Sequence, residues 1–397
     1  MKRTSIFLIA AVFCLGSCEK VQDETPGAVT EEGELVSVED VARILSGAAL
    51  SADNLAEVRD AVAASCDNGY DEEYTMGSLF AAPGTGVGEN LVKASLRRAV
   101  KTYSKPLREV FQEYFAAGGG SATKAGISAQ EYLDYISSSD MQIYWPYSSE
   151  WDGETMPVIT FDPVVNVTSN VGYYMDEDGQ VQEITVTEEL ARERPVWVIN
   201  RNSDADYVSL DVMRRNDPEW GQGGGLVVKS SVSPSAVSSS KALILKNFTA
   251  KRNYDCFFAG ASEFWVKIGS VEHFTASTES ELRLYSPSIT DFMIVVRRSE
   301  VGVTKDIGTL LVSDWTSALD ACALMIVEDD GGSATSWSCS AVVKYNSKSY
   351  GIELTLPFKT RDDIVWRGQM SRKYIETTSN VEGNFGDVSL TFSVVDY

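Results

Sequence analysis

The chain has 397 residues, with 34 Lys and Arg against 57 Asp and Glu, which gives a formal net charge of −23. This acidity argues against a nucleic-acid partner, because phosphate contacts need basic side chains. A hydrophobic content of 44% and an aromatic content of 10% are typical of globular domains, and the length allows two or three of them. The single histidine, His273, excludes multi-histidine zinc sites. We expect it to be an ordinary loop residue, and the sequence predicts no catalytic residue.

The first residues predict an exported, lipid-anchored chain. Lys2 and Arg3 precede an apolar run over residues 6–13, which is too short to span a bilayer, and Leu15-Gly16-Ser17-Cys18 follows. This tetrapeptide resembles the lipobox of bacterial lipoproteins. The resemblance implies a signal peptide over residues 1–17 and a diacylglycerol thioether on Cys18, usually with an N-linked acyl chain such as palmitate. Several acyl chains would anchor the protein stably in a membrane.

Residues 18–36 form a polar, acidic segment, which predicts a tether without a core of its own. Acidic residues just behind the lipidated cysteine resemble the export signal of Bacteroidetes surface lipoproteins, although Lys20 and Val21 interrupt the pattern here. The resemblance implies an outer-membrane lipoprotein that faces the cell surface. The alternative is a periplasm-facing lipoprotein.

Residues 37–140 are predicted to form a helical domain. Ser37 and Ser128 each precede an acidic residue by three positions, which is the pattern of a capping box, and apolar residues at helical spacing follow both. Pro106 predicts a break between two helices within residues 90–115. Residues 118–120 are three glycines, which should end the second of these helices.

Residues 141–200 are predicted to be β-rich, with strands over 156–161, 171–175, 181–187 and 196–199. The second and third strands flank Asp178-Gly179, which is typical of a type I′ hairpin turn. From residue 201 to residue 241 the sequence is rich in Asp, Asn, Gly and Ser, so we expect a flexible loop or linker there.

Residues 242–397 are predicted to form an antiparallel β-sandwich, which makes the whole chain an α+β multidomain protein. The expected strands cover residues 243–248, 263–268, 281–285, 292–297, 309–312, 322–327, 337–345, 350–356 and 388–395. Two segments, Val271-Glu-His-Phe-Thr-Ala-Ser-Thr-Glu and Arg361-Asp-Asp-Ile-Val-Trp-Arg-Gly, are similar to parts of uncharacterised Bacteroidetes lipoproteins. That resemblance covers about residues 141–376 and implies a compartment and a fold, but no activity.

Two kinds of residue cluster predict binding sites. The acidic pairs Asp329-Asp330 and Asp362-Asp363 lie on loops of the same expected sandwich, where they would converge on a calcium ion or simply form solvated turns. Aromatic residues beside Glu150 and Asp152 predict either a platform for sugar rings or a packed junction between domains. A further aromatic residue lies in the 201–241 loop, and the full set is Tyr144, Trp145, Tyr147, Trp151 and Trp220.

Cys322 and Cys339 are predicted to lie opposite each other. With Asp330-Gly331 as the two central residues of a hairpin, the numbers of paired residues add up to 661, and 322 and 339 fit this sum. They would form a closer, non-hydrogen-bonded pair, at a separation that a disulfide can span. The alternative is two free thiols that pack as small apolar side chains.

These patterns favour a binding or interaction protein, held to the outer membrane by its lipid, with a glycan or protein as ligand. No cofactor is required, apart from the candidate calcium ion. A carboxylate-based extracytoplasmic hydrolase is the alternative function.

Overall fold

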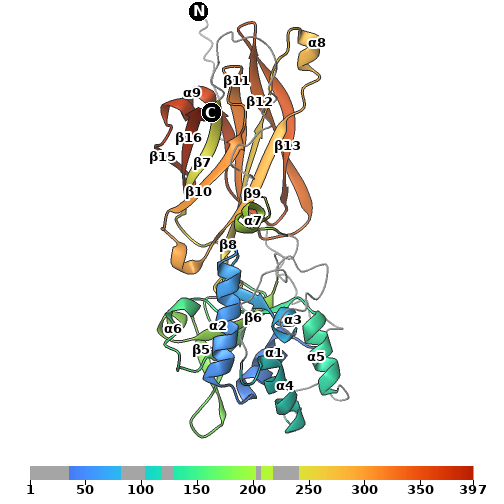
Figure 1. Cartoon of the computed structure of the whole chain (residues 1–397), viewed down its shortest axis with the longest axis vertical. Coiled ribbons are helices and arrows are strands. Elements are labelled where there is room, and N and C mark those ends of the chain that lie inside the picture. The colour runs from blue at the N-terminus through green and yellow to red at the C-terminus, as the bar shows by residue number, and fades with distance from the viewer. Residues whose placement is uncertain (1–34, 82–102, 119–127, 203–206, 218–240, 397) are drawn as a thin grey trace, which may run out of the picture. The chain divides into compact units, whose positions relative to one another are not determined.

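The computed structural model of the chain describes residues 35–81, 103–118, 128–202, 207–217 and 241–396. Residues 36–397 group into one compact unit. The fold is mixed α+β and contains several antiparallel sheets (Figure 1). We call residues 36–202 the α/β region and residues 241–396 the two-sheet region.

The α/β region is built on a six-stranded sheet in the order β1-β2-β6-β3-β4-β5. Strand β3 runs parallel to β6, and every other neighbouring pair in this sheet is antiparallel. The strands are β1 (Glu73–Thr75), β2 (Met141–Tyr144), β3 (Val158–Phe161), β4 (Asn170–Met175), β5 (Val181–Val186) and β6 (Val196–Arg201). Because β1 pairs with β2, the expected helical domain and the expected β-rich domain share this sheet.

Both predicted capping boxes are confirmed. The side chain of Ser37 accepts from the Asp40 amide at the start of α1, and that of Ser128 accepts from the Glu131 amide at the start of α5. A helix, α4, begins directly after Pro106 as expected, while the helix expected before it falls on residues 90–102, which lie outside the described residues. The helices are α1 (Val38–Gly47), α2 (Ala52–Cys66), α3 (Met76–Phe80), α4 (Leu107–Ala116), α5 (Ala129–Ser138), a 3-10 turn (Ser148–Glu150) and α6 (Glu188–Glu193).

The predicted β4–β5 hairpin is confirmed, but its turn differs from the expected one. Asp176 and Gln180 bracket a three-residue loop in which Gly179 alone has a positive φ, of 73°. The loop is therefore a longer turn with glycine in the left-handed position, rather than a two-residue type I′ turn.

The expected loop over 201–241 contains a helix, α7 (Leu210–Asn216). The Ser209 side chain caps its first turn by accepting from the Val212 amide.

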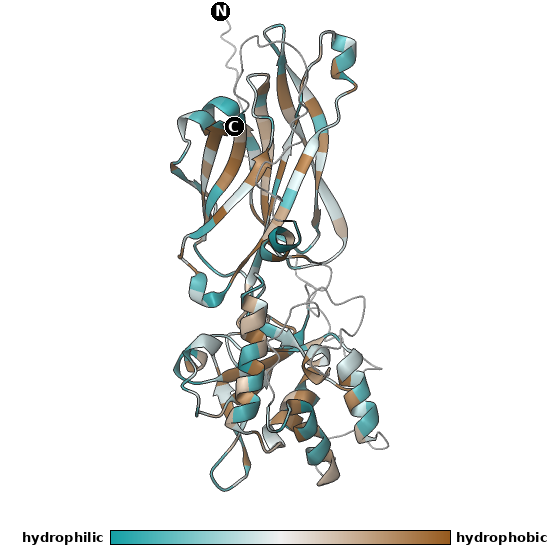
Figure 2. Cartoon of the chain, in the orientation of Figure 1, coloured by the Kyte–Doolittle hydropathy of each residue, from teal (hydrophilic) through white to brown (hydrophobic). Residues whose placement is uncertain are grey.

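The two-sheet region consists of a four-stranded sheet, β10-β7-β16-β15, and a larger sheet, β13-β12-β11-β8-β9, to which β14 adds through β11. Leu, Ile, Val and Phe side chains from both sheets form one buried core. Apolar and polar residues alternate along many of the strands (Figure 2), as one buried face requires. The strands are β7 (Lys241–Ala250), β8 (Ser262–Ser270), β9 (Ser288–Val296), β10 (Lys305–Val312), β11 (Leu319–Glu328), β12 (Ala334–Tyr345), β13 (Lys348–Lys359), β14 (Asp363–Ser371), β15 (Glu382–Phe385) and β16 (Val388–Asp396).

Strand β11 changes partner along its length. It pairs with β12 only at Leu319 and Ala321, with β8 from Ala323 to Glu328, and with β14 from Ala321 to Glu328. Strand β12 instead pairs along its whole length with β13, through a two-residue turn at Asn346 and Ser347. Both turn residues have positive φ, of 47° and 62°, as a type I′ turn requires.

One expected strand in this region is wrong. Residues 281–285 do not form a strand, because the Thr278 side chain accepts from the Glu281 amide and starts the short helix α8 (Glu279–Leu282). Two further helices were not predicted, a 3-10 turn (Arg298–Glu300) and α9 (Arg372–Thr377). None of the described helices is long and apolar enough to cross a membrane.

Candidate functional site

The loops that follow β11 and precede β14 converge, as the sequence predicted. The Asp330 amide donates to Asp362 Oδ1 at 3.3 Å, and Asp363 pairs with Glu328 across the two strands. Protein groups hold two of the four aspartates. Asp329 accepts from Lys359 Nζ at 3.0 Å, and Asp362 also accepts from the Lys359 amide at 2.7 Å. A cation at these four residues would therefore compete with Lys359.

The charges around these loops affect neighbouring carboxylates in opposite directions. Burial alone would raise the pKa of Asp329, but hydrogen bonds from Lys359 and from Trp265 Nε1 outweigh it, so the pKa is lowered. Burial raises the pKa of Asp330, and the nearby Asp363 and Asp362 raise it further. The pKa of Asp362 is raised mainly by burial. Asp329 is thus the one of these three whose pKa is lowered on balance.

A pocket of about 240 Å³ lies beside this loop junction. The half-buried Trp265 lines it, with Lys267 Nζ 4.3 Å from the centre of the indole ring. Lys267 is 6% exposed and pairs with Asp291 at 3.4 Å, and burial lowers the pKa of its ammonium group. The remaining lining combines apolar walls with charged groups, namely Tyr207, Met293, Asp329, Ala334, Pro357, Phe358, Lys359 and Asp362. Aromatic, apolar and charged surfaces therefore meet in one hollow, which we call the Trp265 pocket.

Three carboxylates, which we call the carboxylate triad, gather at the end of the inter-sheet core. Asp255 comes from the loop after β7, Glu263 from the start of β8 and Glu328 from the end of β11, and one oxygen of each lies within 4.8 Å of the others. Glu328 is the deepest, with no exposed surface, and Glu263 is 8% exposed. The triad thus joins three chain segments at one buried point.

Glu328 lies where strand geometry calls for an apolar residue. Successive side chains of a strand alternate between its faces, so Glu328 follows Leu324 and Ile326 on the side that faces the core. Neither of its carboxylate oxygens has a hydrogen-bond partner among the described residues. Burial raises the pKa of Glu328 well above its usual range, and Asp255 and Asp330 raise it further, while Ser262 acts in the opposite direction. The fold therefore gives this carboxylate little stabilisation of its charged form.

A second buried glutamate, Glu72 in the α/β region, has different surroundings. It is 5% exposed, and its carboxylate accepts from the Tyr147 amide at 3.1 Å and from both the amide and the hydroxyl of Ser148 at 3.2 Å. Burial still raises its pKa, although these three donors act to lower it. Glu72 thus holds the chain around residues 147 and 148 in place.

The expected aromatic platform is largely part of the core. Tyr144 is fully buried, and Trp145 and Tyr147 are 1% and 9% exposed, so their ring faces pack against protein. Trp151 is half-buried, and its Nε1 donates to the Thr155 carbonyl at 2.9 Å. A hollow of about 150 Å³ is lined by Trp145, Tyr147 and Trp151 together with Glu150, Asp152 and the 191–195 segment. The sequence signal therefore identified a packed aromatic cluster.

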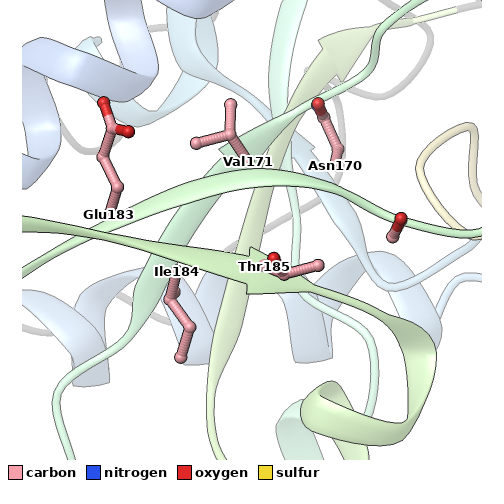
Figure 3. A pocket seen from close by; sticks show the side chains of 6 residues that line it. Asn170, Val171, Glu183, Ile184 and Thr185 are labelled. Carbon is pink, nitrogen blue, oxygen red and sulfur yellow. The ribbon is translucent and has the colours of Figure 1, made fainter.

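Two more hollows lie elsewhere among the described residues. One, of about 440 Å³, lies over the β4–β5 hairpin (Figure 3), where Glu183 and Ile184 extend to opposite sides of β5. Glu183 is the single charged side chain that lines it, so it offers no cluster of functional groups. The other, of about 510 Å³, lies between α8 and β13, where Tyr350 donates to Glu279 at 3.1 Å.

The expected disulfide geometry is wrong. Cys322 and Cys339 are free thiols, Cys322 lies opposite Met370 of β14, and Cys339 lies opposite Leu354 of β13. The turn after β11 is not a two-residue hairpin, since β11 and β12 pair only at Leu319 and Ala321, far from residues 330 and 331. Burial raises the pKa of the Cys322 thiol to about 12.

The other residues singled out in the sequence are His273, Cys18 and Trp220. His273 is an exposed loop residue, and its amide donates to Asp314 Oδ2 at 2.7 Å. Cys18, the signal peptide, the acidic tether up to residue 34 and Trp220 lie outside the described residues. No protein-family model, curated protein or solved structure matches the chain.

Proposed function

We propose that this chain is an acylated outer-membrane lipoprotein that faces the cell surface and binds a ligand in the Trp265 pocket of a C-terminal antiparallel β-sandwich. Support for the anchor comes from the order of basic start, apolar run and Leu15-Gly16-Ser17-Cys18. Support for binding comes from the pocket, where an indole, two lysines and two aspartates meet beside apolar walls.

The pocket's size limits what it can hold. Its volume of about 240 Å³ is below the roughly 300–1,000 Å³ of pockets that enclose a whole small-molecule ligand. We therefore infer that it takes one unit of a polymer, such as a sugar ring of a glycan. An aromatic face contacts the apolar side of such a ring, while Asp329, Asp362 and Lys359 are positioned to bond with hydroxyls.

A binding screen tests this function. The chain from residue 19 onward would be applied to a glycan array, and saturable binding to one glycan class is expected. Lys359→Ala should weaken that binding at least about tenfold, because a charge-assisted hydrogen bond contributes about 1.5–3 kcal/mol. Lys344→Ala is the matched control, because Lys344 is similarly exposed and pairs with Asp320 at 3.1 Å outside the pocket. Equal losses in both variants, or turnover of a polymer without saturable binding, would contradict the proposal.

The anchor has its own test. Cys18→Ala removes the acylated thiol, so the variant should be released from membranes into the soluble fraction, while the parent stays with them. Protease treatment of intact cells should degrade the parent if it faces the surface. A variant that still fractionates entirely with membranes would refute the lipid anchor.

A further inference from the structure

The carboxylate triad shares no residue with the Trp265 pocket or with the four aspartates expected to bind calcium. Its members come from three separate chain segments, and they bring one oxygen each to within 4.8 Å of one another. Three negative charges at such distances repel strongly, the more so away from water. Clustering of this kind therefore needs a compensating positive charge or a bound proton.

Burial of Glu328 is a second, independent observation. An unexposed carboxylate normally accepts hydrogen bonds, because burying a charged group without partners costs several kcal/mol. Both oxygens of Glu328 lack such a partner among the described residues, although the side chain is completely buried and directed into the triad. Ser262 Oγ, the hydroxyl nearest to Glu328 in sequence pairing, donates to Asn253 and accepts from the Tyr254 amide. The oxygens of Glu328 are thus left available to a ligand that provides positive charge.

We propose that Asp255, Glu263 and Glu328 bind a calcium ion that joins the β7–β8 loop to the ends of β8 and β11. Three carboxylates offer up to six oxygens, and Ca²⁺ takes about six to eight oxygens in flexible geometry. Mg²⁺ keeps several of its waters, which a buried triad has little room for. Its ligand Glu328 directly precedes Asp329 in the sequence, but the Asp329–Lys359 pair is not part of the proposed site.

The test uses the purified full chain, stripped of metal with a chelator, and Ca²⁺ alone as the probe. Calorimetric titration should show one saturable site, and Ca²⁺ should raise the melting temperature because it binds the folded state. Mg²⁺ should bind more weakly. Glu328→Gln should lower the Ca²⁺ affinity at least about tenfold, since it removes one of three charged ligands.

Asp363→Asn is the matched control. Asp363 is exposed and lies directly opposite Glu328 in the β11–β14 ladder, so it carries the same charge near the same point without belonging to the triad. Its substitution should change the affinity by less than about twofold, because exposed charges interact weakly. Circular dichroism of the metal-free variants checks that they fold. If Glu328→Gln does not fold, the test is repeated with Glu263→Gln.

Three outcomes would overturn the proposal. The first is equal Ca²⁺ affinity in the parent and in Glu328→Gln. The second is an equal loss in Asp363→Asn, which would mean that the ion responds to the overall acidity of this end. The third is no saturable binding up to about 10 mM Ca²⁺, well above the range of weak extracellular sites. A bound proton rather than a metal would then compensate the triad.

Discussion

Glu72 and Glu328 are both buried glutamates, but the two regions of the molecule treat them differently. In the α/β region, two amides and a hydroxyl from residues 147 and 148 converge on Glu72. In the two-sheet region, Glu328 lies at the end of an apolar core, and its oxygens have no hydrogen-bond partner among the described residues. A buried carboxylate that the fold supplies with donors is part of the scaffold. One that it does not supply needs either a bound proton or a positively charged ligand.

The largest expected effect comes from removing the well-supplied carboxylate. Glu72→Ala leaves two amides and one hydroxyl without their acceptor, and each such loss costs about 1–3 kcal/mol. We expect the free energy of unfolding, measured with urea, to fall by about 3 kcal/mol. Glu150→Ala, at an exposed glutamate of the adjacent 3-10 turn, should change it by less than about 0.5 kcal/mol. A similar loss of unfolding free energy in both variants would show that the hydrogen bonds to Glu72 do not stabilise the fold.

A smaller effect is expected for Asp329, which follows Glu328 in the sequence and pairs with the ammonium group of Lys359. Asp329→Asn should cost about 1 kcal/mol at neutral pH, since Lys359 is 40% exposed and water weakens the pair. The folded-state pKa of Asp329 is lowered, so its contribution is present above the unfolded value of about 4 and is lost as the pH falls through the folded value. Asp330 and Asp362 have raised pKa values, so their contributions have the opposite sign and decline as the pH rises.

Unfolding at a series of pH values measures the Asp329 effect. The parent and Asp329→Asn should differ above about pH 4 and converge in stronger acid. Asp320→Asn, which breaks the more exposed pair with Lys344, should have the smaller effect. A difference that stays constant down to pH 2 would show that Asp329 acts through packing instead of charge.

We expect no effect on stability from reduction of the cysteines. Because Cys322 and Cys339 are free thiols on differently paired strands, a reductant should leave the melting temperature of the two-sheet region unchanged. Alkylation of the denatured, non-reduced chain should label both cysteines, as read by peptide mass spectrometry. Recovery of the two peptides as one linked species would contradict the strand pairing described above.

Local signals in the sequence predicted local structure well. The capping boxes at Ser37 and Ser128 and the helix start after Pro106 depend on neighbouring residues, and all three are confirmed. The expected strand over residues 281–285 was wrong. The alternating Leu282 and Leu284 favoured a strand, but Thr278 is a helix cap and starts α8. Strand β14 was missed because Gly368 and several polar residues interrupt its pattern.

The site depended on pairings that no local pattern reveals. The convergence of the loops at Asp329 and Asp362 followed from their common sheet, so it could be anticipated. The separation of β12 from β11 beyond Ala321 could not, and it removed the basis for the disulfide. Glu328 did leave a signal, since it continues the alternate spacing of Leu324 and Ile326 where an apolar residue is expected. Its partners Asp255 and Glu263 are brought in only by the tertiary fold.

The pairing of one edge of β11 with β14 also affects how the chain reaches its folded state. The β12–β13 hairpin closes through a two-residue turn, and hairpins of this kind form within about 1–10 μs. Strand β14 must return across 48 residues to place Met370 beside Cys322, and contacts so distant in sequence form more slowly. Until it arrives, most of that edge of β11 exposes unpaired amides and carbonyls, which other chains can pair with. A change that weakens the docking of β14 should therefore appear first as aggregation during refolding, before it lowers the equilibrium stability of the finished protein.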